Sequence, residues 1–120
     1  MVKSRQKGNR TQLKAIRYLE DAGFLVNKVE VGGRFEKVKD LFGLFDLCAI
    51  RTHDLFLVQV TSNTPHTHKK YLEFSKNYDL DQVTFAQFVW YDKPKKPRGW
   101  KFFWYTKGKQ EVEDFRRKPK

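Results

Sequence analysis

One acidic and three neutral oxygen-bearing side chains occupy positions from which they could bind a hard metal ion. Asp46 begins one apolar run, and Gln59-Val60-Thr61 ends the next run along the chain. Gln12 shares one face of an expected helix with Ile16 and Leu19. A hard divalent cation takes oxygen ligands from separate elements, and the start of a strand adjoins the end of its antiparallel partner. The sequence therefore indicates a candidate metal site at this junction.

The turn between the two runs decides whether Asp46 shares a face with Gln59 and Thr61, which strand alternation places together. A four-residue turn over 51–54 gives Asp46 a cross-strand partner on that face, whereas a three-residue turn sends it to the opposite face. An unpartnered acid among apolar neighbours is costly, so we expect either a metal or an Arg or Lys beside Asp46. Gln59 either binds the same metal or is merely hydrogen-bonded.

Three segments of the chain together resemble the PD-(D/E)xK nuclease superfamily, and they are most similar to archaeal-type Holliday junction resolvases and small phage nucleases. The segments are 7–12, which opens the first helix, 45–50 and 57–61, and the similarity extends over residues 5–75. It implies a restriction-endonuclease-like α/β fold, in which helices flank a mixed sheet in the order α-β-β-β-α-β. It also implies magnesium-dependent hydrolysis of DNA.

The resemblance assigns roles to five residues. It implies that Asp46, Gln59 and the backbone carbonyl of Val60 bind Mg²⁺ or Mn²⁺, and that Gln12 and Thr61 complete the catalytic set. The family carries an acid at the helix position and a Lys at the last position. This chain departs at both, because Gln12 is uncharged and Thr61 cannot stabilise an attacking hydroxide by charge.

Other residues could replace the missing charges. Asp40 is a candidate acid on the preceding loop, although it could equally pair with Lys37 or Lys39. Lys69 or Lys70, on the second expected helix, could supply the missing cation.

The charge of the chain points to a polyanionic partner. There are 25 Lys and Arg against 14 Asp and Glu, a formal net charge of +11. An excess of this size indicates nucleic acid, with DNA favoured over RNA by the resemblance. A membrane surface is disfavoured, because the basic residues are not confined to one amphipathic helix. Nucleic-acid contacts are predicted for Lys3, Arg5, Lys7, Arg10, Lys37, Lys39, Lys69, Lys70, Lys95, Lys96 and Arg98.

Apolar spacing predicts a single domain over 1–120 with basic terminal extensions. Gly23 should end the first helix in a left-handed conformation. A hairpin at the centre of the sheet should be covered by one helix on each face. The expected helices are 9–22 and 69–78, the expected strands are 24–31, 45–50, 55–61, 83–91 and 100–106, and the expected loops are 34–43 and 93–99.

The last third of the chain is rich in aromatic residues. One face of 100–105 should belong to the core, and the other could stack on bases or form a dimer interface. An enzyme that resolves a junction cuts two strands, so we expect a two-fold homodimer that uses 83–91 or 100–105.

Several classes of protein are disfavoured by composition. No apolar run approaches the ~18 residues of a membrane span, and no signal peptide is expected, which favours a cytoplasmic location in a prokaryotic or phage-infected cell. A single Cys48 excludes an internal disulfide. His66 and His68 lack further ligands at zinc spacing.

Three hypotheses about function follow from these observations. The first is a metal-dependent DNA endonuclease, either Holliday-junction-resolving or structure-selective. The alternative is a catalytically decayed nuclease fold that binds DNA or RNA, and a third hypothesis is an unrelated basic, aromatic single-strand-binding module. If Asp46 faces away from Gln59, the binding function is favoured.

Overall fold

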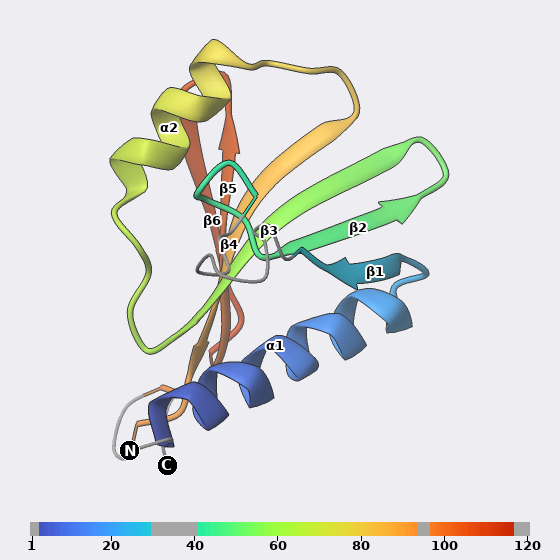
Figure 1. Ribbon diagram of the computed structural model, residues 1–120. Helices are drawn as coiled ribbons and strands as arrows, with labels where there is room; N and C mark the ends of the chain where they lie inside the picture. Colours follow the sequence, from blue (N-terminus) through green and yellow to red (C-terminus); the bar gives the residue numbers. More distant parts are fainter. Residues whose placement is uncertain (1–2, 30–40, 94–96, 117–120) are drawn as a thin grey trace, which may run out of the picture.

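The computed structural model describes residues 3–29, 41–93 and 97–116, with side chains from Arg10 onward. These residues form two helices and one sheet (Figure 1). No helix among them has the length and apolarity that a span across a lipid bilayer requires. In chain order the elements are α1 (Lys3–Asp21), β1 (Leu25–Lys28), β2 (Leu47–Arg51), β3 (Asp54–Ser62), α2 (His68–Asn77), β4 (Val83–Tyr91), β5 (Gly99–Thr106) and β6 (Lys109–Asp114).

The sheet is mixed, and its strands lie side by side in chain order from β1 to β6. Neighbouring strands are antiparallel except for β3 and β4, which are parallel. A parallel pair needs a crossover connection, and α2 lies in it. The two helices lie on opposite faces of the sheet (Figure 1).

Apolar side chains form a core layer on each face. The layer beneath α1 contains Val58 and Val60 of β3, and the layer beneath α2 contains Leu57. This division follows from alternation, which sends successive side chains of a strand to opposite faces. The prediction that the hairpin of β2 and β3 lies inside the sheet, with a helix over each face, is confirmed.

The boundaries of α1 explain how the chain enters the sheet. Gly23 adopts the predicted left-handed conformation, with φ of +93°. Its N–H donates to the carbonyl of Glu20 at 2.9 Å, and the N–H of Phe24 donates to that of Leu19 at 3.0 Å, which is a Schellman motif. The helix begins at Lys3 and not at residue 9, so the basic segment expected to be an extension belongs to α1.

β6 is not among the strands expected from the sequence. Its side chains are all exposed, so it lacks the apolar alternation by which a strand is recognised. The strand forms because Lys107 and Gly108, with φ of 52° and 79°, make a two-residue turn after β5. The expected strand 24–31 is also shorter than predicted, and residues 30–40, which include most of the expected loop 34–43, lie outside the described residues.

The aromatic strands β4 and β5 lie in the interior of the sheet and not at its edges. The side chains of Phe85, Phe88, Phe102, Phe103 and Tyr105 are at most 5% exposed. These five aromatic side chains therefore belong to the core, whereas those of Trp90, Tyr91, Trp100 and Trp104 are only partly buried. The homodimer expected to use these strands stays a prediction.

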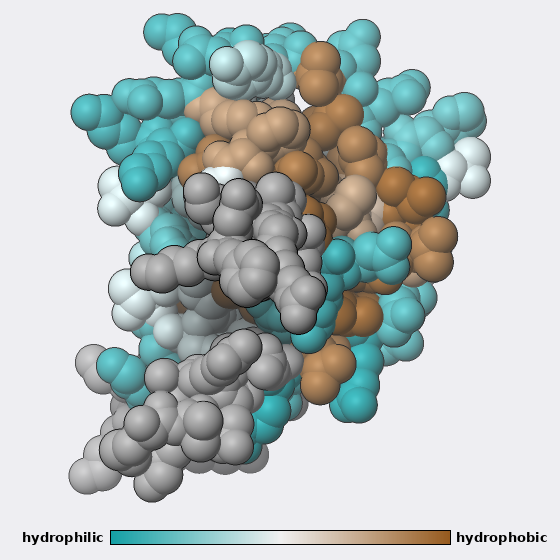
Figure 2. Space-filling model, viewed as in Figure 1, coloured by the Kyte–Doolittle hydropathy of each residue, from teal (hydrophilic) through white to brown (hydrophobic). Residues whose placement is uncertain are grey.

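The exposed apolar surface lies beside α2 instead, as Figure 2 shows. Phe42, Tyr78 and Leu80 are each more than half exposed. Together with three core side chains they line a groove of about 530 Å³. None of its described lining residues is cationic, so these residues offer no charge to a phosphate backbone.

Candidate nucleic-acid interface

Asp46 lies just before β2, where a local distortion turns its side chain toward α1. Its N–H donates to the carbonyl of Val58 at 3.0 Å, although Leu47 already pairs with Val58 in the register. Two consecutive residues therefore oppose one, as in a β-bulge, and a bulge re-aims the side chain. The Asp46 side chain consequently leaves the face that simple alternation would give it.

The Asp46 carboxylate joins β3 to α1. Its Oδ1 accepts the N–H of Val60 at 3.2 Å, and its Oδ2 accepts Nε2 of Gln12 at 2.7 Å. The residue is buried, with 7% of its surface exposed. Gln12 therefore reaches Asp46 from α1, as expected. A metal, an Arg or a Lys beside Asp46 stays a prediction.

Gln59 and Thr61 do not join this cluster. The hairpin has the register expected for a four-residue turn over 51–54, because Ile50 pairs with Leu55. However, Gln59 faces the α2 side of the sheet, where its Nε2 lies 3.4 Å from Nε2 of His66. The Oγ1 of Thr61 is buried without a hydrogen-bond partner within the described part of the chain. The bulge at Asp46 therefore separates the acid from the two residues predicted to act with it.

The predicted magnesium ligands do not converge on one point. Val60 presents its N–H to the carboxylate of Asp46, where its carbonyl was expected. Magnesium requires several oxygen ligands around one point, and Gln59 lies on the other face of the sheet. In residues 3–29, 41–93 and 97–116, no group of three or more His, Cys, Asp and Glu could hold a metal. The candidate acid Asp40 lies outside the described residues.

A second cluster of polar side chains occupies the α2 face. The hydroxyl of Tyr105 accepts Nε2 of Gln87 at 2.8 Å and lies 2.7 Å from Nδ1 of His68. Burial raises the pKa of Tyr105 to about 12, and burial followed by the charge of Lys101 lowers the pKa of His68. These contacts connect α2 to β4 and β5.

Three basic residues of α1 gather on the opposite side of the sheet, at one cavity. Arg10, Lys14 and Arg17 are spaced four and three residues apart, so they lie on one face of the helix. All three side chains are exposed, and all three line the cavity. Thr11 holds this part of α1 against the end of β3, because its Oγ1 lies 2.6 Å from Oγ of Ser62.

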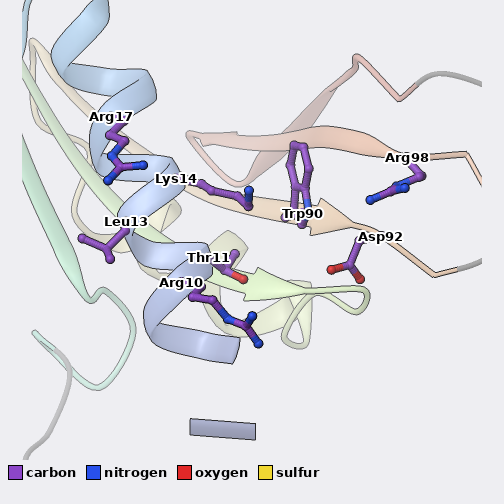
Figure 3. A pocket seen from close by; sticks show the side chains of 8 residues that line it. All are labelled: Arg10, Thr11, Leu13, Lys14, Arg17, Trp90, Asp92 and Arg98. Carbon is purple, nitrogen blue, oxygen red and sulfur yellow. The ribbon is translucent and has the colours of Figure 1, made fainter. Parts of the chain in front are cut away.

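The other wall of the cavity comes from the end of β4 and the start of β5. Trp90 is half-buried, and Nζ of Lys14 lies 5.1 Å from the centroid of its ring. Asp92 follows on the chain, held by Asn63 through bonds of 2.9 and 3.0 Å. Arg98 lies just before β5 and is exposed. Figure 3 shows these residues facing the cationic residues of α1.

This cationic cavity has a volume of about 570 Å³. Among the side chains that the structure describes, four cations and one carboxylate line it. A cleft lined mainly by one sign of charge focuses the field and concentrates ions of the other sign. The cavity therefore attracts anions, and Trp90 adds an aromatic surface beside the cations. Its lining residues are Arg10, Thr11, Leu13, Lys14, Arg17, Trp90, Asp92 and Arg98.

The structure divides the predicted nucleic-acid contacts into groups. Arg10 and Arg98 line the cationic cavity. Lys69 and Lys70 are exposed on α2, on the other face of the sheet. Lys3, Arg5 and Lys7 belong to α1, without described side chains, and Lys37, Lys39, Lys95 and Lys96 lie outside the described residues.

The sequence analysis assigns neither Lys14 nor Arg17 to a contact site. Their spacing from Arg10 was a usable signal, because positions i, i+4 and i+7 of a helix share a face. Trp90 was visible only as one aromatic residue among many. Its position beside α1 depends on the sheet register, which pairs Ser62 with Trp90.

Comparisons with known proteins add no family assignment. No protein-family model matches the chain, and no curated protein matches it either.

Proposed function

We propose that this domain binds nucleic acid through the cationic cavity and that its nuclease-like architecture carries no working hydrolytic site. The observation that carries the proposal is the convergence of Arg10, Lys14, Arg17 and Arg98 around one cavity that also contains Trp90. Cations neutralise phosphates and release counterions, which supplies most of the affinity for a nucleic-acid backbone. The formal net charge of +11 supports the same conclusion.

The arrangement of the elements supports a nuclease-like architecture. The chain runs α1-β1-β2-β3-α2-β4, the order that the resemblance implies, and two further strands follow. The separation of Asp46 from Gln59, and the neutral Thr61, argue against hydrolysis within that architecture.

Binding of a labelled oligonucleotide to charge-reversed variants tests the proposal. Lys14→Glu with Arg17→Glu should weaken binding by about tenfold or more, because two phosphate-neutralising groups become repulsive. Lys69→Glu with Lys70→Glu is the matched control, since it makes the same change in net charge on the opposite face. Equal losses in the two variants would refute the cavity as the binding site. DNA and RNA strands of the same sequence, measured in parallel, identify the preferred nucleic acid.

Phosphodiester hydrolysis by a structure-selective endonuclease is the second candidate function. The contact between Gln12 and Asp46 favours it, because the resemblance implies that both belong to a catalytic centre. Incubation of branched and linear DNA with magnesium or manganese tests it, with the wild type compared with Asp46→Ala. If the domain only binds nucleic acid, no cleavage that depends on Asp46 should be observed. Cleavage that Asp46→Ala abolishes while binding persists would establish the enzyme instead.

A further inference from the structure

We propose that the cationic cavity takes an unpaired base of a single-stranded nucleic acid, stacked on Trp90, while the surrounding cations hold the flanking phosphates. The inference rests on the proposed function and specifies its ligand. Single-strand binding sites combine a cationic groove with aromatic rings on which bases stack. Both parts are present here, on opposite walls of one cavity (Figure 3).

The ring of Trp90 is held in place and reachable. Its centroid lies 5.2 Å from that of Trp100, with the two planes at 69°, and such a steep contact fixes an indole against its neighbour. The ammonium of Lys14, 5.1 Å from the same centroid, lies within the range of a cation–π contact. Trp90 is thus partly exposed and lines the cavity, where the ammonium of Lys14 lies over its ring.

Lys14 can exchange this contact for a phosphate. Its side chain is exposed and joins the helix through a flexible stem, so the ammonium can move without disturbing the core. A base that stacks on Trp90 would replace the ammonium of Lys14 over the ring. The strand would bring its phosphates to Arg10, Arg17 and Arg98, which line the same cavity.

The shape of the cavity favours an unpaired base over a duplex. In a duplex the face of each base is covered by its neighbours, and exposing it requires unstacking and unpairing. A volume of about 570 Å³ is in the range of pockets that enclose a small ligand. One nucleotide of a single strand can enter such a pocket, whereas a duplex can only place its backbone at the rim.

Three probes separate stacking from charge: a labelled single-stranded oligodeoxynucleotide, the duplex of the same sequence, and an abasic strand of equal length. The wild type should bind the single strand more tightly than either of the others. Trp90→Leu, which keeps an apolar side chain against Trp100, should weaken single-strand binding about tenfold. It should leave abasic-strand binding unchanged, because that strand offers only phosphates. Trp104→Phe, a loss of an indole outside the cavity, should change none of the three affinities.

The outcomes distinguish this inference from the proposed function. If Trp90→Leu binds all three probes as the wild type does, while Lys14→Glu with Arg17→Glu abolishes binding, the cavity binds phosphates only and the stacking inference is overturned. If the cavity charge reversal has no effect on any probe, the proposed function fails as well. Circular dichroism of each variant verifies that it is folded.

Discussion

The carboxylate of Asp46 has a structural role, because it accepts hydrogen bonds from two neighbouring N–H groups. Asp46 lies just before the first residue of β2, so no backbone carbonyl within β2 lies opposite the N–H of Val60. The carboxylate supplies the missing acceptor and at the same time receives the amide of Gln12. Two N–H donors of the described residues therefore contribute to the stability of an acid among apolar strands.

This role predicts that Asp46 contributes to stability. Asp46→Ala leaves the buried N–H of Val60 without its acceptor, which should lower the free energy of unfolding by about 1–3 kcal/mol. Asp46→Asn should lose less, because an amide oxygen can still accept from Val60 and the amide of Gln12 can turn to match it. Urea unfolding of the three proteins measures the difference. Wild-type stability in Asp46→Ala would contradict the structural role.

At the residue scale, sequence reasoning reached the contact of Gln12 with Asp46 but not the position of Gln59. Gln12 and Asp46 are adjacent because α1 packs directly over β3. The face of Asp46 depends on the bulge, which arises from one N–H bonded out of register to Val58. Neither composition nor alternation carries a signal for a single displaced hydrogen bond.

At the scale of elements, α2 is tied to the sheet through a polar network rather than through apolar contacts alone. Its first residue, His68, packs its ring 4.6 Å from that of Phe103 and reaches the hydroxyl of Tyr105. Since that hydroxyl already accepts from Gln87, its own hydrogen is free to be donated to Nδ1 of His68. The bond therefore suits a neutral imidazole.

The stability of the domain should consequently fall in mild acid. Burial, and then the charge of Lys101, lowers the pKa of His68 in the folded state below the usual 6.5. The unfolded chain therefore takes up the proton first, so the contribution of His68 to the free energy of unfolding is fully present above pH 6.5 and is lost as pH falls toward the folded pKa. Urea unfolding at a series of pH values measures this.

Two histidine variants test whether His68 causes this pH dependence of stability. His68→Gln should remove this part of the pH dependence, whereas His53→Asn, a change in the exposed turn between β2 and β3, should retain it. An unchanged profile in His68→Gln would exclude His68 as the source.

Elements with an apolar pattern could be predicted, and those without one could not. β4 and β5 were found to within a residue because their alternating apolar side chains fill the core. β6 has no buried side chain, and it exists through its backbone bonds to β5. Helix α1 extends to Lys3 in a segment without apolar repeats, where the sequence offered only charge.

At the scale of the whole molecule, the two faces of the sheet differ in chemistry. The α1 side carries the cationic cavity, and the α2 side carries the apolar groove lined by Phe42, Tyr78 and Leu80. The sequence predicted a strongly basic domain but not this division, because the division depends on which side of the sheet each helix covers. Net charge by itself is the same for any placement of the cations.

The division predicts how binding should respond to salt. Affinity for a single strand should fall with salt, with a slope of log K against log salt of about −0.7 for each phosphate neutralised. Lys14→Glu with Arg17→Glu should reduce the magnitude of this slope by about one or more, because the cavity then neutralises fewer phosphates. Lys69→Glu with Lys70→Glu lowers the net charge equally but leaves the cavity intact, so its slope should stay close to that of the wild type. Titrations between 50 and 300 mM potassium chloride, at about physiological ionic strength and on either side of it, measure all three slopes. If the slopes of the two double variants fall together, the protein attracts nucleic acid through its overall charge, and the cationic cavity has no special part in binding.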